Sequence, residues 1–507
     1  MIRISLATVK QATPRIRSRP RFDRDADALD AILTIIPVDA TATLFERLPG
    51  NERWLTAIGR KPAPGSVHVT TLCNPRQTLA VAGVLPAGAS TFDTLSLAGR
   101  MVKQLGQATG KVSVVGLAAP RPAGSDDAAL AALLSATLAQ DFALPSWRKS
   151  APGAGALQRI EVMGEVPDLA RLQAAAYGNN LARWLTALPP NKLTAQTYRR
   201  LLGEAAREHK LSLSWLDEAA LKRLGCGAFL AVAAGNARRT AGIAHLRYRP
   251  PRLTRRSAPD VALVGKGILF DTGGTNLKGH RGMLDMHTDM AGSAVALGVL
   301  CALARLRAPI AVDCWLAITE NRTGPDAYVP QDVVTAANGL SIQVIHTDAE
   351  GRMVLADTLA LAGRTSPRLM IDYATLTGAC ITALTERMSG AFVNRPGLLP
   401  AVVAAGSTSG ERVWPFPFEA DFDADLDSKV ADILQCTEDS KGDHILAARF
   451  LGRFVPHDTP WLHLDLSSAT RSGGLAHVNT TITGFGVRYT LELLRNGLEP
   501  LLNGVGP

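Results

Sequence analysis

The sequence has 507 residues, of which 47% are hydrophobic and 20% are charged. This composition excludes a mainly disordered chain, a collagen-like repeat and a coiled coil, and the length predicts two to four domains or one large domain with an appendage. The formal net charge of +9 permits contact with anionic partners without requiring it. Six scattered cysteines without a Cys-x-x-Cys pair, and an N-terminus without a secretory pattern, indicate a cytoplasmic protein with free thiols.

The first part of the chain alternates short apolar stretches with helix-like ones, which is typical of an α/β domain. The stretches are residues 27–40, 77–86, 94–106, 111–119 and 126–142. We therefore expect a smaller N-terminal α/β domain that comprises residues 1–166.

Residues 168–188 carry apolar side chains at three- and four-residue spacing, which predicts a long helix. Pro189 and Pro190 end it, because proline cannot continue the helical hydrogen-bond pattern. We expect this helix to join the first domain to the remainder of the chain, so that the second region comprises residues 167–507.

The second region predicts a larger α/β/α domain with a central mixed sheet, because nearly continuous apolar runs are typical of strands buried on both faces. The runs are residues 260–270, 310–318, 342–348, 368–376 and 461–466, with helical patterns between them at 292–306, 354–364 and 445–455. In such sheets, ligands bind beyond the carboxyl ends of the strands. The longest uncharged apolar run, residues 290–304, is too short to span a bilayer, so we expect a buried helix and no membrane contact.

A first group of chemically active residues lies around the strand at 260–270. Lys266 is embedded in this apolar strand, and Asp271 closes it before a Gly-Gly turn. Apolar surroundings disfavour an ammonium ion, so we expect the neutral amine of Lys266 to be available as a ligand or base. Lys278 and Asp289 follow, and because Asp289 closely precedes a predicted helix, a plain helix cap is the alternative interpretation of that residue alone.

A second group lies in HTDAEGR, residues 346–352. If strand geometry persists here, Asp348, Glu350 and Arg352 share one face. Two carboxylates on one face repel each other and stay ionised only if a cation neutralises them. Arg352 supplies one positive charge, but a divalent metal supplies more and prefers oxygen ligands.

The charges of the two groups together favour a pair of metal ions. Their four carboxylates belong to Asp271, Asp289, Asp348 and Glu350. Two divalent cations balance these charges, and the amine of Lys266 adds a nitrogen ligand. Such a set predicts a two-metal hydrolytic site. Lys278 and Arg352 remain as positive groups for the transition state or for an anionic auxiliary base.

The same residues carry a resemblance to a known family. HTDAEGR closely resembles the NTDAEGR signature of the leucyl aminopeptidase (cytosol aminopeptidase) family. VGKGILFDTGG, MHTDMAG, DYATLTGA and LARWLTALPPNKLTA, which begin at residues 264, 286, 372 and 181, are similar to other segments of that family. The resemblance runs from about Leu181 to the C-terminus.

The resemblance implies a role for each of these positions. Lys266, Asp271, Asp289 and Glu350 would hold one metal, and Asp271, Asp348 and Glu350 the other, with a hydroxide between the ions as nucleophile. The two catalytic residues would be Lys278, which donates to the oxyanion, and Arg352, which holds a bicarbonate as general base. Substrate contacts would come from Lys266, Lys278, Met286, His346, Thr375 and Leu376.

The resemblance also implies partners and cofactors. The expected activity is that of a metallo-aminopeptidase that removes N-terminal residues from peptides with a free α-amine. The expected cofactors are two divalent ions, zinc or manganese, with bicarbonate as an auxiliary group. The expected assembly is a homohexamer.

Some positions depart from the family pattern. His346 replaces the usual Asn two residues before Asp348, and His287 lies similarly close to Asp289. Gln331 replaces the Gly of the usual PGDVV, and the segments at 224–236 and 464–470 differ as well. We expect these changes to alter side-chain preference more than the reaction.

Two alternatives remain open at this stage. One is a DNA-binding regulatory protein on the same scaffold, which the +9 charge and an arginine run favour. The run consists of Arg247, Arg249, Arg252, Arg255 and Arg256. The other is a two-metal phosphoesterase, although Lys266 and the ATLTG segment favour a peptidase.

Overall fold

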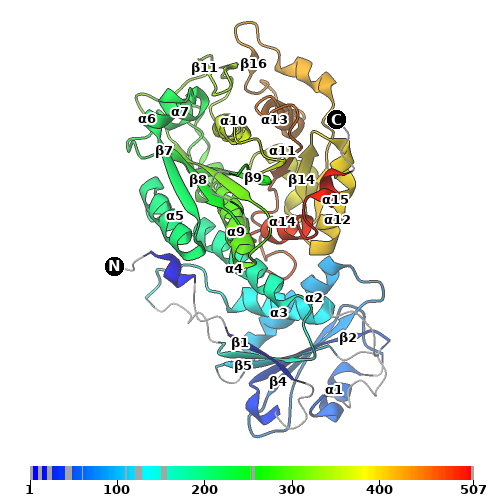
Figure 1. Ribbon diagram of the computed structural model, residues 1–507. Helices are drawn as coiled ribbons and strands as arrows, with labels where there is room; N and C mark the ends of the chain where they lie inside the picture. The colour runs from blue at the N-terminus through cyan, green and yellow to red at the C-terminus, as the bar shows by residue number, and fades with distance from the viewer. Residues whose placement is uncertain are drawn as a thin grey trace.

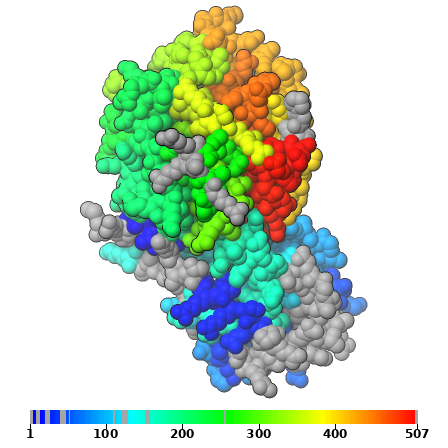
Figure 2. All heavy atoms as spheres, viewed as in Figure 1, coloured from blue at the N-terminus to red at the C-terminus, as the bar shows by residue number. Residues whose placement is uncertain are grey.

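The computed structural model describes residues 4–9, 14–19, 26–39, 48–59, 61–108, 111–119, 128–149, 157–251, 253 and 257–503. Figure 1 shows a smaller α/β part, formed by the N-terminal segments, below a larger one that continues to the last helices. Figure 2 shows the same division on the surface, with blue and cyan below and green to red above. Arg252, Arg255 and Arg256 of the arginine run lie outside the described residues.

The smaller part is built on a six-stranded sheet in the order β1-β6-β5-β2-β4-β3. The strands are β1 (Arg15–Arg19), β2 (Ala31–Pro37), β3 (Val67–Thr71), β4 (Leu79–Leu85), β5 (Val114–Ala118) and β6 (Arg159–Met163). Only β3, at the edge, is antiparallel to its neighbour.

Helices cover both faces of this sheet. They are α1 (Asn51–Ile58), α2 (Thr91–Lys103) and α3 (Ala128–Asp141). Leu33 packs with α2 and α3 on one face, whereas Ile32 packs with Trp54 of α1 on the other. Neighbouring residues of a strand therefore enter different cores, as the two-residue period of a strand requires.

Helix α4 (Leu169–Thr186) joins the two parts, and the helix predicted at 168–188 is confirmed. It ends before Leu188 and Pro189, and it packs along α9 (Ala291–Arg305) of the larger part. Since β6 ends at Met163 and α4 begins at Leu169, we propose a domain boundary between them.

The larger part contains an eight-stranded sheet in the order β15-β14-β17-β13-β9-β10-β8-β7. The strands are β7 (Ser212–Asp217), β8 (Gly242–Tyr248), β9 (Val261–Asp271), β10 (Val312–Asn321), β13 (Leu369–Ala374), β14 (Ser389–Val393), β15 (Val413–Pro415) and β17 (Trp461–Asp465). The four central strands, β17, β13, β9 and β10, are mutually parallel, and antiparallel pairs lie toward both edges. The predicted mixed sheet is confirmed.

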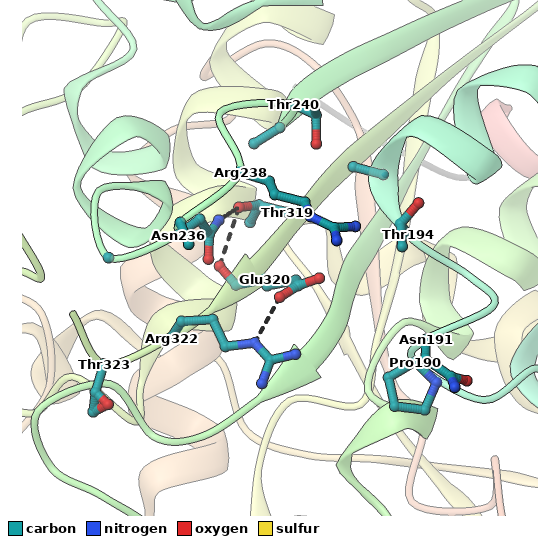
Figure 3. A pocket seen from close by; sticks show the side chains of 14 residues that line it. Pro190, Asn191, Thr194, Asn236, Arg238, Thr240, Thr319, Glu320, Arg322 and Thr323 are labelled. Atoms are coloured by element: carbon teal, nitrogen blue, oxygen red, sulfur yellow. Dashed lines mark hydrogen bonds and ion pairs between the residues drawn. The ribbon is translucent and has the colours of Figure 1, made fainter.

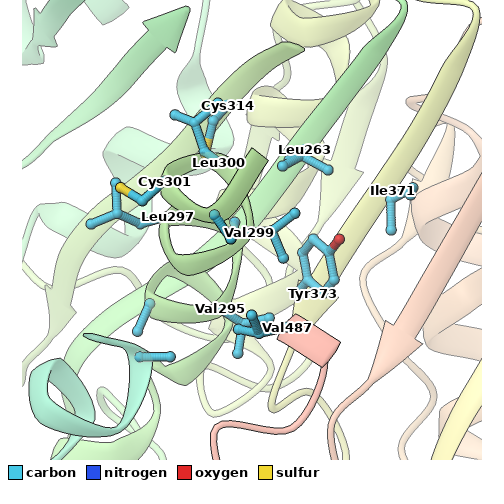
Figure 4. Close-up of a cluster of buried hydrophobic side chains, with 14 of the residues drawn as sticks. Leu263, Val295, Leu297, Val299, Leu300, Cys301, Cys314, Ile371, Tyr373 and Val487 are labelled. Atoms are coloured by element: carbon cyan, nitrogen blue, oxygen red, sulfur yellow. The ribbon is translucent and has the colours of Figure 1, made fainter. Parts of the chain in front are cut away.

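Helices on both faces of this sheet complete the expected α/β/α layers. One face packs against α4, α5 (Ala195–His209), α9, α12 (Leu399–Ser409) and α14 (Val487–Leu493). The other packs against α7 (Gly227–Ala233), α10 (Glu350–Gly363) and α13 (Asp443–Gly452). Figure 4 shows Val295 and Val299 of α9 among Leu263 of β9 and Tyr373 of β13. Shorter helices are α6 (Glu218–Arg223), α8 (His280–Met283), α11 (Gly378–Leu384) and α15 (Glu499–Leu502).

The prediction of a central strand at residues 342–348 is wrong. Only β12 (Ser341–Gln343) forms there, and it belongs to a separate three-stranded sheet with β11 (Val333–Thr335) and β16 (Ile433–Leu434). The strand stops because the amides of Ile345 and His346 donate to the side chain of Gln435 instead of to a neighbouring strand.

The apolar run at 290–304 forms helix α9, which is buried in the core. Among the described residues, one helical stretch, 280–305, is long and apolar enough to cross a membrane. However, 83% of its most apolar window is buried inside the protein. The expected buried helix is confirmed, and the position of α9 in the core accounts for its apolar composition.

Gln331 has a backbone conformation that favours glycine. Its φ is +79°, in the left-handed region, where a Cβ atom crowds the neighbouring carbonyl. Its amide donates to the carbonyl of Val344 at 2.7 Å, and its side chain accepts from Gln343 at 2.7 Å. These contacts hold the strained turn that leads from β10 toward β11.

Gln331→Gly should therefore raise the free energy of unfolding by about 1 kcal/mol, because the strain at the left-handed residue is relieved. Gln331→Val should lower it by a similar amount, since a β-branched residue tolerates this conformation least. Thermal unfolding of the three proteins tests this order. A midpoint for the valine variant at or above that of the parent would show that the turn is not strained.

Candidate active site

Strand β9 places two predicted site residues at the centre of the larger sheet. Lys266 is 3% exposed and Asp271, the last residue of the strand, is 2% exposed. The Lys266 side chain runs across the first turn of α10, where a Cβ atom on Gly351 would come within 2.6 Å of its Cε. Glycine at this position therefore leaves room for the lysine to pass the helix and reach Asp289 and Glu350.

The amine of Lys266 lies between two carboxylates. Its Nζ is 2.8 Å from Oδ1 of Asp289 and 3.0 Å from Oε1 of Glu350. It also donates to the carbonyl of Thr375 at 2.9 Å, and the Thr375 hydroxyl donates to Asp289 at 2.7 Å. The helix-cap interpretation of Asp289 is wrong, because α9 has Met290 at its N-cap and the Asp289 carboxylate is engaged by these two residues.

Lys278 connects the other two carboxylates. Its Nζ is 2.9 Å from Oδ2 of Asp271 and 2.5 Å from Oδ1 of Asp348. Asp271, Asp348 and Glu350 each offer an oxygen within 4.8 Å of the others, a spacing at which one ion contacts all three. The structure thus brings together all five predicted metal ligands and Lys278.

Asn321 completes the environment of Asp271, and no motif in the sequence indicates it. Its side-chain amide donates to Oδ1 of Asp271 at 2.8 Å and to the carbonyl of Thr347 at 3.0 Å. A shift in register between β9 and β10, just before Asn321, brings it opposite Asp271. Such irregularities commonly re-aim a side chain beside a functional site.

The prediction that Asp348, Glu350 and Arg352 share one face is wrong, because the segment is not a strand. Asp348 lies in a turn and Glu350 begins helix α10. Consequently the guanidinium of Arg352 turns toward Asp443, at 2.6 Å, and toward the carbonyl of Gln435, at 3.1 Å. Its Nε is buried without a hydrogen-bond partner among the described residues.

Gln435 is a second residue that the sequence did not indicate. Its side-chain oxygen accepts from the amides of Ile345 and His346, and its amide donates to the carbonyl of Ala349 at 3.1 Å. Gln435 thereby fixes the backbone on both sides of Asp348. A lone glutamine in an irregular segment carries no pattern that could have revealed this role.

The expectation of a neutral Lys266 is wrong for the side chains by themselves. Burial alone lowers the pKa of its amine, but attraction by Asp289, Glu350 and Asp271 outweighs burial and raises it above the ordinary value. The pKa of Lys278 is raised by Asp271 in the same way, again against burial. A metal ion at Lys266 therefore has to displace a proton.

In the carboxylates, unlike in the two lysines, the pKa shifts disfavour the charged form. Burial, and then the charge of Asp271, raises the pKa of Glu350 to about 8. Burial raises the pKa of Asp289 to about 6, against the opposing charge of Lys266. The pKa of Asp348 is raised by burial and by Asp271. Four carboxylates face two lysines, so full ionisation leaves two negative charges uncompensated in a buried space.

Divalent cations fit this donor set. Oδ2 of Asp289 and Oε2 of Glu350 are buried and have no hydrogen-bond partner in the described part of the chain. Buried polar atoms are normally paired, so such oxygens point to a missing cation partner. Carboxylate oxygens, with one amine nitrogen, suit zinc or manganese.

The remaining predicted substrate contacts are placed at different distances from this cluster. Thr375 is part of the cluster. Leu376 lies beside the first turn of α10, since its methyl group would come within 3.0 Å of a Cβ atom added to Gly351. His346 is exposed, and its Nδ1 accepts from the amide of Asp348 at 3.2 Å. Met286 is half-buried in the turn that leads to Asp289.

A cavity of about 530 Å³ lies close by, but it is not the metal cluster. Figure 3 shows its lining, in which Asn236 contacts Thr319 and Arg322 contacts Glu320. Its lining includes none of the five predicted metal ligands. Size therefore does not identify the site here, and the chemistry of the side chains decides.

The profile of the "Cytosol aminopeptidase family, catalytic domain" matches residues 180–491. The chain belongs to the cytosol aminopeptidase family. The matched range contains both groups of residues on which the resemblance rested, and it begins within one residue of the predicted start at Leu181.

Curated relatives agree with this membership of the cytosol aminopeptidase family. A probable cytosol aminopeptidase of Syntrophotalea carbinolica is 42% identical over 336 residues, which span 64% of this chain and 64% of that protein. One from a Synechococcus strain is 37% identical over 461 residues, 89% of this chain and 93% of that protein.

Solved structures of similar proteins share the fold. The bottromycin maturation enzyme BotP in complex with Mn has a TM-score of 0.80 and 30% identity, covering 92% of this chain and 99% of that one. A mutant tomato leucine aminopeptidase has a TM-score of 0.82 and 25% identity, covering 96% and 97%. The cytosol aminopeptidase fold therefore includes the N-terminal part as well as the catalytic part.

The stability of the metal-free protein should fall as the pH rises from 5 to 8. The folded-state pKa of Glu350 is about 8 against an ordinary value of 4.5, so between these values the folded state holds a proton that the unfolded state has lost. Lys266 and Lys278 stay protonated throughout this window and do not reverse the slope. Mn²⁺ should raise the unfolding midpoint more at pH 8 than at pH 6, because it competes with that proton.

Thermal unfolding of chelator-treated protein, with and without Mn²⁺, measures both effects. Glu350→Gln provides the control, since it removes the group that titrates near pH 8 and should flatten the pH dependence between pH 6 and 8. An equal Mn²⁺ shift at both pH values in the parent protein would contradict the competition.

Proposed function

We propose that this protein is a metal-dependent aminopeptidase that hydrolyses the N-terminal peptide bond of peptides with a free α-amine. The observation that carries this proposal is the convergence of Lys266, Asp271, Asp289, Asp348 and Glu350 on one buried cluster. Its family membership, and the Mn-bound state of the similar BotP structure, support metal dependence.

The chain offers two overlapping sets of ligands. Lys266, Asp271, Asp289 and Glu350 would hold one divalent ion, and Asp271, Asp348 and Glu350 the other. When bound, the ions would supply Lewis acidity and lower the pKa of a water, which gives the hydroxide nucleophile. Asn321 holds Asp271 in orientation, and Thr375 does the same for Asp289.

Lys278 is the group best placed to stabilise negative charge on the substrate. Its side chain is 17% exposed, so it lies at the edge of the cluster, where a substrate carbonyl can reach it. Its raised pKa keeps the amine charged at neutral pH. With Asp271 and Asp348 engaged as ligands, Lys278 would have its protons free to donate to the developing oxyanion.

Arg352 has a more limited role in this proposal. Asp443 and Gln435 fix its guanidinium, and the buried Nε leaves one donor for a small anion such as bicarbonate. An anion held there would act as an auxiliary base near Glu350. We extend the proposal to zinc or manganese as the ions, to a cytoplasmic location and to a homohexamer, in line with the family.

The DNA-binding alternative receives no support from the matched family or from the relatives. The site chemistry likewise favours hydrolysis at a metal pair over a purely regulatory scaffold.

Asp348→Ala and Glu350→Ala should each reduce kcat/KM for leucine p-nitroanilide with Mn²⁺ by at least about 100-fold, since each removes a ligand. Asp326→Ala is the matched control, because this aspartate is exposed in the loop after β10. Activity in both ligand variants within a few-fold of the parent would refute the proposed site.

His346→Asn should change substrate preference more than metal binding. The imidazole is exposed, the neighbouring backbone is fixed by Gln435, and an asparagine oxygen can replace Nδ1 as the acceptor of the Asp348 amide. The replacement therefore alters the substrate-facing surface and leaves Asp348 in place. We expect the ratio of kcat/KM between two dipeptides that differ in the second residue to change by about tenfold, with an unchanged Mn²⁺ affinity. An unchanged ratio would place His346 away from the substrate.

A further inference from the structure

A second cavity, of about 470 Å³, lies between the two domains. One wall is helix α2 of the N-terminal domain, and the others come from the C-terminal domain near β14, β15 and the loop at 471–479. This volume is in the ordinary range for small-molecule sites. We call it the basic pocket, defined by Asp93, Arg100, Lys103, Arg387, Arg412 and Arg471.

Helix α2 contributes one face to the basic pocket. Asp93, Ser96, Arg100 and Lys103 recur at three- and four-residue spacing, so they lie along the same side of the helix. The opposite wall is anchored to this helix, because the side chain of Asn479 donates to the carbonyl of Gly99 at 2.8 Å. The two walls therefore have a fixed separation.

The charges in the basic pocket are not balanced. It has five cationic side chains and one acid, and the Asp93 carboxylate is already engaged by the backbone amide and hydroxyl of Ser90 in a capping box. Within the described ranges, no carboxylate lies at ion-pair distance from any of the five cations. Like charges brought together without counter-charge destabilise a fold unless a ligand offsets them.

Three of the five cations donate hydrogen bonds to neutral groups. Arg100 donates to the carbonyl of Gly65 at 2.8 Å, and Arg471 to that of Gly474. Arg387 donates to the hydroxyl of Thr385 at 3.4 Å. These contacts orient the side chains and leave their charges unneutralised.

Arg412 lies at the side of the basic pocket. Its guanidinium stacks on Phe92 at 3.8 Å, and its Nε is buried without a hydrogen-bond partner in the described structure. Burial lowers the pKa of Arg412, Asp93 opposes this, and the positive charge of Arg387 lowers it further. Two arginines close enough to repel each other thus line the same space.

We propose that the basic pocket binds a small polyanion with two or three linked phosphoryl groups. The net charge of the six side chains is +4, and two phosphoryl groups carry roughly −3 to −4 at neutral pH. Four of the five cations are arginines, whose planar fork matches phosphate oxygens better than a lysine does. The pocket is concave and confined, which suits a compact anion better than the extended contact that a duplex requires.

Isothermal titration of the full-length protein with inorganic tripolyphosphate tests the proposal. We expect saturable binding to one site per chain, and Arg100→Gln/Lys103→Gln should weaken it at least about tenfold, because two charged donors are lost. Glutamine keeps the helix propensity of the originals, and both positions are exposed, so the fold should be retained.

Lys222→Gln/Arg223→Gln is the matched control, since these are also two exposed cations in the last turn of a helix, α6. It should change the affinity less than twofold. Equal losses in both double variants, or binding of sulfate as tight as that of tripolyphosphate, would overturn the proposal by showing a non-specific charge effect. Loss of duplex-DNA binding in the α2 variant with unchanged tripolyphosphate binding would overturn it in favour of a nucleic-acid surface.

Discussion

The contact of Lys266 with Asp289 and Glu350 is the interaction on which the rest of the site depends. A buried carboxylate without a partner is costly, and a group of four is far more so. Each of the two lysines bridges two carboxylates, so that Lys266 and Lys278 together keep all four within one cluster. The result is a site whose charge is only half compensated by the chain itself. This imbalance makes it receptive to divalent cations.

The parallel strands at the centre of the sheet explain how distant residues meet. Because β17, β13, β9 and β10 run in one direction, their carboxyl ends lie along one edge. Asp271 and Asn321 end two of these strands, and Thr375 follows a third directly. The side chain of Asp465, at the end of the fourth, accepts from the amide of Leu376 and from the hydroxyl of Thr377, and so fixes the segment that contacts Lys266.

The sequence predicted the layers, and it predicted that the five candidate ligands lie together, for identifiable reasons. Long apolar runs rich in β-branched residues, such as β9, are typical of buried strands, and acidic residues next to such runs stand out against them. The prediction for residues 346–352 was wrong because the orientation of these side chains depends on partners from distant parts of the chain. Helix α10 begins at Glu350 and turns Arg352 toward Asp443, a residue 91 positions further along the chain. Nothing in the local pattern at 346–352 reveals that partner.

The contacts around Asp348 determine which residues of this site can vary. The hydroxyl of Thr347 accepts from the amide of Asn276 at 2.8 Å and donates to the carbonyl of Gly273, while Gln435 holds the amide of His346. The His346 side chain accepts from the amide of Asp348, but most of the contacts that hold the backbone around Asp348 come from Thr347 and Gln435. A substitution by asparagine, whose side-chain oxygen can accept from the same amide, therefore changes the surface offered to a ligand without moving the carboxylate. This is a physical reason why position 346 can vary while the carboxylates beside it stay in place.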